Sequence, residues 1–291
     1  MKLVVVVPFL NEEEHLPKML ASIGRQERLP DRLVLVDDGS TDGSPGIAAE
    51  FAADHPYATL LRRPVRPAER DRMAKAAELD AFQWGLAKVS EPWDVVAKLD
   101  ADLEATPDLF AELERRFESD PGLGMAGAYL SVVNPAGVRR HRCPPDHVEG
   151  ATSFYRRECF DQISPLPPIL GWDTIDEVRA RMHGWRTQSF PMPSGDPVLL
   201  RRTGSHDGIL RGFRRTGLAA YAYGAHPLHV LGAAVVRTRE RPLVLGGVNY
   251  LGGWAGAALT RRPRAERDVR QRVRQENLAR MRRTVAARAR R

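Results

Sequence analysis

Three short apolar segments, each followed directly by acidic or helix-capping residues, constrain the fold of this chain more than any other feature of its sequence. They are Val4–Val7, Leu33–Val36 and Val95–Leu99. Segments that are apolar at nearly every position are typical of strands buried on both faces, as in a parallel sheet. The stretches between them, residues 13–25, 44–54 and 72–88, are predicted to be helical, which gives right-handed βαβ units. The acidic ends of the three strands should therefore share one edge of the sheet.

The loop after the first segment is predicted to bind a ligand without a glycine-rich phosphate cradle. Pro8 is expected to end the strand, and Asn11 to cap a helix whose first turn contains Glu12–Glu14. Open α/β sheets bind ligands at the carboxyl ends of their strands. Neither G-x-G-x-x-G after the strand nor G-x-x-x-x-G-K-[ST] occurs in the chain, so a Rossmann dehydrogenase or a P-loop enzyme is not expected.

The composition is that of a globular protein. The chain has 291 residues, of which 43% are hydrophobic and 28% charged, enough to bury a large core. Met1 leads into the first strand without an apolar signal segment. Cys143 and Cys159 are the only cysteines, which excludes a disulfide framework and a four-cysteine zinc site. We therefore expect a cytosolic protein.

The positive charge of the chain is concentrated at its C-terminal end. The net charge is +7, yet residues 261–291 contain 13 arginines and 3 acidic residues, which leaves residues 1–260 with a net charge of −3. Such a tail could meet anionic lipid, nucleic acid or water. No aromatic residue lies among these arginines, so base stacking is unsupported and no nucleic-acid partner is expected.

The third apolar segment ends in a candidate metal site. Asp100 and Asp102 are separated by one residue and can present their carboxylates to one divalent ion. Hard oxygen ligands suit magnesium or manganese, which would be shared with substrate phosphates and would neutralise a departing diphosphate. A solvated turn is the alternative for an isolated D-x-D pattern, but its position after two similar strands favours the metal site.

The chain resembles the inverting glycosyltransferases of family 2, which have the GT-A fold. The resemblance rests on four segments in order, namely VVVVPFLNEE, VLVDDGSTDGS, AKLDAD and GWDTIDEVRARMHGWRT. It covers roughly residues 1–205, with a donor half at about 1–105 and an acceptor half at about 106–205. It implies a single Rossmann-like, mostly parallel α/β sheet flanked by helices. Residues 206–291 would form an apolar and arginine-rich helical extension.

The resemblance also implies a UDP- or GDP-sugar donor, a divalent cation, Mn²⁺ or Mg²⁺, and an acceptor hydroxyl. It places the nucleobase and ribose against the loop around Pro8, Phe9 and Asn11. Glu12 would lie close by and Asp38 against the base.

Three further donor-side residues follow from the resemblance. Lys75 matches a basic residue near the donor, with a solvated lysine as the alternative. Asp100 would approach the ribose or the metal, and Asp102 would ligate the metal directly.

A loop beyond these residues adds a candidate diphosphate clamp. Arg201, Arg202 and His206 lie in the glycine-punctuated segment LLRRTGSHDG, for which a plain surface loop is the alternative. His206, His226 and His229 are also candidates for a further metal ligand, although single histidines are more often structural.

By the same resemblance, the catalytic base comes from the acceptor half. The family usually has Glu-Asp at the start of a helix facing the donor, where this chain has Trp172 and Asp173. Asp173 is expected to be the base, Trp172 to stack on a sugar and Asp176 to orient the acceptor. The alternatives are that Asp173 only caps a helix over residues 174–183 and that Asp176 is an exposed helix acid.

The C-terminal extension contains a candidate membrane element. Residues 242–260 are 19 consecutive uncharged residues, which borders on the roughly 17–25 apolar residues of a membrane span. A span, a membrane-surface element and a packed helical segment all remain open. The tail, from about residue 265 to 287, is expected to be a solvated helix. Together these segments make an anionic membrane a candidate partner, with the protein peripheral on the inner face of the plasma membrane.

The expected function is inverting, metal-dependent transfer of a sugar from a nucleotide-diphosphate sugar to an acceptor hydroxyl, on a lipid-linked or cell-envelope glycan. A nucleotidyltransferase is disfavoured, because it would have a glycine-rich basic loop after the first strand. A non-catalytic sugar-nucleotide-binding or membrane-scaffolding member of the same fold remains an alternative, because Trp172 replaces the usual glutamate.

Overall fold

The three apolar segments form neighbouring parallel strands, as predicted. The computed structural model describes residues 1–64, 72, 75–134, 137–141, 143–201, 208–239 and 242–289. The three strands are β1 (Leu3–Phe9), β2 (Arg32–Asp37) and β4 (Val95–Leu99). β1 lies between the other two and pairs in parallel with both. The carboxyl ends of all three therefore lie at one edge of the sheet.

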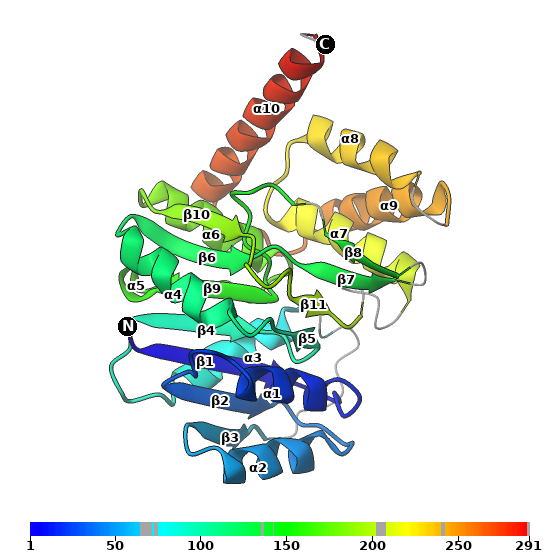
Figure 1. Cartoon of the computed structure of the whole chain (residues 1–291). Coiled ribbons are helices and arrows are strands. Elements are labelled where there is room, and N and C mark those ends of the chain that lie inside the picture. The colour runs from blue at the N-terminus through cyan, green and yellow to red at the C-terminus, as the bar shows by residue number, and fades with distance from the viewer. Residues whose placement is uncertain are drawn as a thin grey trace. The chain divides into compact units, whose positions relative to one another are not determined.

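These strands belong to a seven-stranded sheet with the order β10-β6-β9-β4-β1-β2-β3 (Figure 1). Its other members are β3 (Ala58–Arg62), β6 (Leu123–Ala128), β9 (Thr152–Arg156) and β10 (Arg186–Phe190). β9 runs antiparallel to β4 and β6, and the remaining pairs are parallel. The α/β fold with a mostly parallel sheet is thus confirmed.

A second sheet of four short strands was not predicted from the sequence. Its order is β5-β11-β7-β8. The strands are β5 (Leu103–Glu104), β7 (Ser131–Asn134), β8 (Gly137–Arg140) and β11 (Val198–Leu199). β5 begins directly after Asp102, so this sheet places the chain around β11 beside the carboxyl end of β4.

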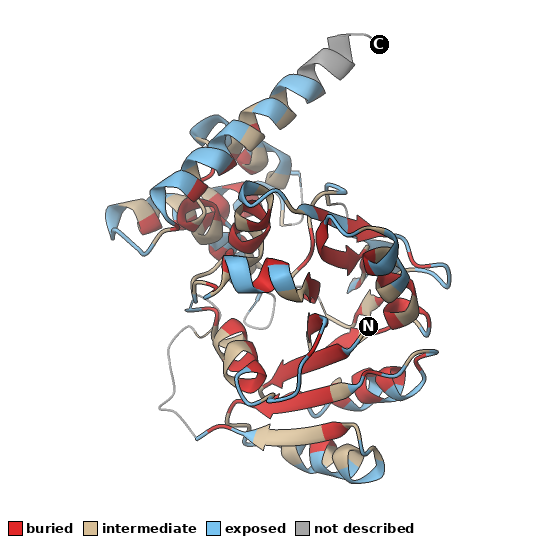
Figure 2. Cartoon of the chain, turned by 90° about the vertical axis from the view of Figure 1, so that its left-hand side faces the viewer, coloured by how far each residue is buried: buried red, intermediate tan, exposed pale blue. Residues whose placement is uncertain are grey.

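Helices cover both faces of the large sheet around β1 and β2. On one face, alternate residues of β1 share a core with α1 (Leu16–Gly24) and α4 (Leu109–Ser119). On the other face, α3 (Ala77–Leu86) lies directly against the strands, because Gly85 has no side chain. A Cβ at Gly85 would lie 2.4 Å from Val36 Cγ2 and 3.3 Å from Val6 Cγ1. The central strands are buried along their length, whereas β3 at the edge is partly exposed (Figure 2).

The prediction that Pro8 ends the first strand was wrong. β1 continues through Pro8 to Phe9, and both residues pair with β2. Its pairing with β4 ends earlier, at Val6. Pro8 therefore lies where β1 has a single neighbouring strand, a position at which a missing N–H is tolerated.

The prediction that Asn11 caps the first helix was also wrong. α1 begins at Leu16, and no acidic residue lies in its first turn. Pro17 favours this later start, because proline suits the first turn of a helix. Asn11 has φ 54°, and its side-chain oxygen accepts a hydrogen bond from Thr41 N–H at 2.8 Å. The Asn11 side chain therefore binds the loop after β2 instead of capping α1.

The predicted bounds of the other helices agree with the structure to different degrees. α2 (Ser44–Asp54) has the predicted bounds, whereas α3 is shorter than the predicted 72–88. α5 (Arg157–Ile163) follows β9 and was not predicted.

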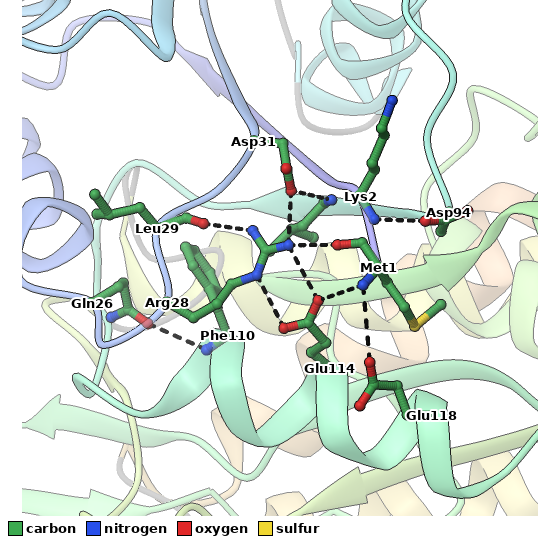
Figure 3. A network of polar contacts seen from close by, with 11 residues as sticks. Met1, Lys2, Gln26, Arg28, Leu29, Asp31, Asp94, Phe110, Glu114 and Glu118 are labelled. Carbon is green, nitrogen blue, oxygen red and sulfur yellow. Dashed lines mark hydrogen bonds and ion pairs between the residues drawn. The ribbon is translucent and has the colours of Figure 1, made fainter.

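A charged network around Arg28 fixes the opposite edge of the sheet, where the strands begin (Figure 3). The Arg28 guanidinium donates to Glu114 of α4 at 3.0 and 3.1 Å and to Asp31 at 2.7 Å. Asp31 also accepts a hydrogen bond from Leu3 N–H at 2.8 Å. The start of β1 is thus tied to the loop before β2 and, through Arg28, to α4.

The described chain divides into two compact units. The first comprises Met1–Arg70, Ala77–Leu166 and Ala180–Arg202, and the second comprises Asp71–Ala76, Pro167–Arg179 and Thr203–Arg291. The second unit contains the start of α6 (Trp172–Met182) and the helices α7 (Ile209–Ala222), α8 (Pro227–Arg237), α9 (Leu245–Leu259) and α10 (Arg267–Ala289).

The expectation that the last helix is merely solvated was wrong for its first half. Val269 and Val273 of α10 are buried and pack against Ile175 and Val178 of α6. These two valines are four residues apart and so lie on one face of the helix. The first half of the arginine-rich tail therefore contributes to the core of the second unit.

We expect Gly85→Ala to lower the free energy of unfolding by about 1–3 kcal/mol, the usual cost of overpacking a core. The added methyl group would meet Val36 and Val6, which outweighs the gain in helix propensity of up to about 1 kcal/mol. Gly46→Ala in α2 is the matched control, because no atom lies within 4 Å of the new Cβ, and it should leave stability unchanged or raised. Urea denaturation measures both, and equal effects at the two positions would contradict the close packing of α3.

Candidate active site

Hydrogen bonds join the loop after β1 to the loop after β2. Asn11 N–H donates to Ser40 Oγ at 3.0 Å, and Glu12 N–H donates to Ser44 Oγ at 2.8 Å. Asp38 N–H donates to the carbonyl oxygen of Phe9 at 2.9 Å. The serines of DDGSTDGS therefore shape the loop that was predicted to receive the donor nucleoside.

Arg201 joins two acids that are distant in the sequence. Its Nη2 donates to Glu12 Oε1, and its Nε lies 2.9 Å from Asp102 Oδ2. Both acidic residues are only 8% exposed. The second sheet explains the placement, because β11 pairs with β5 directly after Asp102 and Leu200 N–H donates to the Asp102 carbonyl at 2.9 Å. From the sequence, Arg201 was predicted only as part of a diphosphate clamp.

Lys98 is a site residue that the sequence analysis missed. It lies within β4 and is 2% exposed, and its Nζ contacts Asp100 Oδ1 and donates to the Gly150 carbonyl at 3.0 Å. Residues two apart in a strand lie on the same face. Lys98 could therefore have been identified from the sequence as a lysine in an apolar strand, two residues before an acid.

The surroundings of the Asp102 carboxyl group favour its protonated form. Burial and the charge of Asp100 raise the pKa of Asp102 to about 7, with a smaller contribution from Glu12, although Arg201 lowers it. The cluster thus contains more negative charge than Arg201 alone compensates.

The acidic cluster fits a divalent cation that also binds substrate oxygens. Glu12 Oε2 is buried and has no hydrogen-bond partner among the described residues. In the described part of the chain, no group of three or more His, Cys, Asp or Glu side chains is arranged to hold a metal by itself. Magnesium typically uses one or two protein carboxylates together with substrate phosphates, so Asp102 and Asp100 would suffice as protein ligands.

Asp38 belongs to a charged network that was not predicted. Arg63 Nη1 donates to Asp38 Oδ1 and its Nη2 to Asp80 Oδ2, each at 2.8 Å. The Arg63 guanidinium also lies 5.5 Å from the centre of the Trp84 ring. An arginine directly after β3, which pairs in parallel with β2, was the available signal for this partner of Asp38.

The remaining donor-side predictions are placed as follows. Pro8 and Phe9 are buried, and Phe9 belongs to the core. Lys75 is exposed and belongs to the second unit. Arg202 and His206 lie outside the described residues. The roles of all these residues in donor binding stay predictions.

Asp173 lies inside the first turn of α6, which begins two residues earlier than it would if Asp173 were its N-cap. Its carboxylate accepts a hydrogen bond from Thr174 N–H at 2.9 Å. Asp173 is partly exposed, whereas Trp172 is 4% and Asp176 is 0% exposed. The alternative that Asp176 is an exposed helix acid was therefore wrong. Of these three residues, Asp173 is the one most open to an acceptor.

Gly171 positions the start of α6. It has φ 86°, and a Cβ there would lie 2.9 Å from Tyr223 Cδ1. Burial raises the pKa of Tyr223, and the charges of Tyr250 and Asp173 raise it further. Tyr223 therefore remains neutral next to the start of α6.

One histidine considered as a metal ligand has a structural role. His226 Nδ1 accepts a hydrogen bond from Leu228 N–H at 3.2 Å and so caps α8.

Comparison with known proteins gives a family. The family model described as Glycosyl transferase family 2 matches residues 4–163, more than half of the chain. The chain is 36% identical over 110 residues to an undecaprenyl-phosphate 4-deoxy-4-formamido-L-arabinose transferase from Pectobacterium carotovorum, covering 36% of this chain and 30% of that protein. It is 29% identical over 142 residues to a polyprenol monophosphomannose synthase from Mycolicibacterium smegmatis, covering 47% of each. The chain thus spans less than half the length of these relatives.

Solved structures agree on the fold. A mannosyltransferase from Pyrobaculum calidifontis, in complex with GDP-Man and Mn²⁺, matches 99% of this chain and 80% of its own length with a TM-score of 0.54 and 18% identity. The architecture is therefore the GT-A fold, as the resemblance implied.

We expect Asp102→Asn to stabilise the metal-free protein increasingly as the pH rises from about 4 to about 7. The folded-state pKa of about 7 lies above the ordinary aspartate value of about 3.9, so the unfolded chain loses this proton first as the pH rises. The wild-type protein therefore loses stability between about pH 4 and about pH 7, and the variant does not. Urea denaturation in the presence of a chelator, repeated across this pH range, measures the difference.

Asp42→Asn is the control for this titration. Although burial raises the pKa of Asp42, hydrogen bonds involving Ser44 and Glu13 lower it overall. Asp42 contributes stability above its unfolded pKa and loses it only in acid, so the effect of this variant should be constant between about pH 5 and about pH 8. An equally flat difference for Asp102→Asn would contradict the raised pKa.

Proposed function

Because the chain belongs to glycosyl transferase family 2, we propose that it transfers a sugar from a nucleotide-diphosphate sugar to a polyprenyl-phosphate acceptor. The observation that carries the donor half of this proposal is the pairing of Arg201 with buried Glu12 and Asp102, beside the partly exposed Asp100, at the carboxyl edge of the sheet. The acceptor class follows the names of the two relatives, one acting on undecaprenyl phosphate and one on polyprenol. GDP and UDP are the candidate nucleotides.

The donor would lie across the loops after β1 and β2. Their backbone is preshaped by Ser40 and Ser44, and Asp38 is held in place by Arg63 for contact with the base. Arg201 presents a planar fork that suits phosphate oxygens as well as carboxylates. Asp102, with Asp100, would hold a divalent cation.

The proposed reaction is a single displacement that inverts the anomeric centre. The acceptor oxygen attacks the anomeric carbon from the side opposite the nucleotide diphosphate, which leaves with the bonding electron pair. A bound divalent cation would supply neutralisation of charge on the leaving diphosphate. Arg201 and Lys98 limit the repulsion between that diphosphate and the three acidic side chains.

The chemistry of the acceptor decides whether Asp173 acts as a base. A phosphate monoester has its second pKa near 6, so an acceptor phosphate is already anionic at neutral pH and needs no base. A hydroxyl acceptor must lose a proton, for which the partly exposed carboxylate of Asp173 is suited. A hydroxyl of a lipid-linked glycan is therefore the second candidate acceptor, supported by the position of Asp173 at the start of α6.

The two acceptor classes can be separated by one variant. With polyprenyl phosphate, we expect Asp173→Asn to retain transfer within about 10-fold of wild type, whereas a hydroxyl acceptor should lose at least about 10²-fold. Transfer of radiolabelled sugar from UDP- and GDP-sugars to each acceptor measures this, and calorimetry of donor binding shows that the variant is intact. Absence of transfer to either acceptor with every donor would refute the proposed function and favour a non-catalytic sugar-nucleotide-binding protein.

We expect Asp102→Asn to abolish metal-dependent donor hydrolysis while the circular dichroism spectrum remains that of the wild type. The amide keeps the shape of the side chain but removes the charge that a cation needs. Glu104→Gln is the control, because Glu104 is a partly exposed acid in β5, two residues from Asp102. Full hydrolysis by Asp102→Asn at the same manganese concentration would remove Asp102 from the metal site.

A protein with this function would act at the inner face of the plasma membrane, where a nucleotide sugar and a lipid-linked acceptor meet.

A further inference from the structure

α9 is apolar on its exposed face as well as on its buried face. The whole helix contains no charged residue. Its buried residues are Gly246, Gly247, Tyr250, Gly253 and Ala257. On the outside, Leu245, Val248 and Leu259 are 47%, 57% and 84% exposed. A helix in contact with water normally presents charged side chains on its outer face, so this face suits a non-aqueous neighbour.

Close backbone packing fixes which face of α9 points outward. A Cβ at Gly217 of α7 would lie 1.9 Å from the Tyr250 carbonyl oxygen, and a Cβ at Gly253 would lie 2.0 Å from the Arg214 carbonyl oxygen. The backbones of α7 and α9 are therefore in contact through glycines. Any rotation of α9 about its axis would bring a side chain into this contact, so its outer apolar residues cannot turn inward.

α8 and the turn before α9 also expose large apolar side chains. α8 packs on α9 through Val230, Ala234 and Tyr250. Of the fourteen large hydrophobic side chains that the described residues expose, nine belong to α8, α9 and this turn. We call these nine residues the α8–α9 surface: Leu228, Leu231, Val235, Val236, Leu243, Val244, Leu245, Val248 and Leu259. Exposed apolar side chains gathered on two helices that pack on each other point to an interaction site more than single residues scattered over a surface do.

The charge around this surface is almost entirely positive. Residues 208–265 contain nine arginines and one acidic residue, Glu240, which lies outside the described residues. Arg239 lies near one end of the surface and Arg261 and Arg262 near the other, and all three are exposed. Two copies of the surface placed face to face would bring these arginines together, which disfavours a homodimer. An anionic partner with an apolar interior complements both features.

The length of α9 determines how it meets such a partner. No helix in the described part of the chain is both long enough and apolar enough to cross a membrane. α9 has 15 residues, which corresponds to about 22 Å against the roughly 30 Å of a bilayer core. The helix is suited to lie in the plane of the interface.

We propose that the α8–α9 surface docks on an anionic membrane, with its apolar side chains at the boundary between headgroups and acyl chains and Arg239, Arg261 and Arg262 at the lipid phosphates. Apolar burial and electrostatic attraction add in this binding mode. The inference rests on the proposed function only in that a lipid-linked acceptor would lie in the same membrane.

Sedimentation of the full chain with vesicles tests the proposal. Vesicles of phosphatidylcholine alone are compared with vesicles that also contain phosphatidylglycerol, both without any polyprenyl phosphate. We expect binding to the anionic vesicles to fall at least about 10-fold between about 50 mM and about 500 mM salt, because screening weakens exposed charges. Deletion of the tail is unsuitable as a variant, because Val269 and Val273 of α10 belong to the core of the second unit.

Point variants on exposed residues separate the apolar from the charged contribution. We expect the double variant Leu245→Asp, Val248→Asp to lose at least about 10-fold in binding to anionic vesicles, and Arg261→Glu, Arg262→Glu to lose a similar factor. The matched control is Leu29→Asp, Val138→Asp, which introduces the same charges at exposed apolar positions of the first unit and should bind as the wild type does.

Three results would overturn the proposal. They are no binding of the wild type at low salt, an equal loss in the control variant, or a solution dimer that Leu245→Asp, Val248→Asp converts to a monomer. Donor binding is measured separately by calorimetry without vesicles. Vesicle binding without sugar transfer would refute the proposed function and support the docking surface. Sugar transfer without vesicle binding would support the proposed function and refute the docking surface.

Discussion

Carboxylates gathered at one edge of a parallel sheet repel one another unless positive charge lies among them, and the first unit is built around this requirement. Asp100 is paired with Lys98 of β4, the strand that it follows, and Asp38 with Arg63, which follows the neighbouring parallel strand β3. Arg201, which follows β11, lies between the acids that end β1 and β4. Each cation reaches the edge from a different segment, so the charge balance depends on the whole topology.

The positive charge at this edge does not fully balance the negative charge of the acids. The remaining negative charge is what would bind a cation. Asp102 keeps a raised pKa, and one oxygen of Glu12 is buried without a partner among the described residues. Both features are unfavourable for the protein alone, and both are relieved by a cation. The protein is therefore expected to bind its donor more readily with a metal than without one. Near neutral pH, it is also expected to be less stable than a variant in which residue 102 carries no charge.

The two units carry net charges of opposite sign. Residues 1–202, which contain the first unit, have a net charge of −7, and residues 203–291, which make up most of the second unit, have a net charge of +14. The family match ends at residue 163, before α6 and the helices that follow. What the second unit does must therefore be inferred from its own residues, and the glycine contacts of α7 with α9 are the most specific evidence there, because they hold an apolar face outward.

The sequence by itself determined the three parallel strands, the edge that their acids share and the bounds of α2. These features are local, since strand and helix periods are visible in consecutive residues. The tertiary structure alone decided that Asn11 binds Thr41 instead of capping α1, that Arg201 meets Glu12, and that Val269 is a core residue. In each case a side chain has a partner from a distant segment. Partners of this kind are set by which segments the topology brings together, and no pattern in neighbouring residues records that choice.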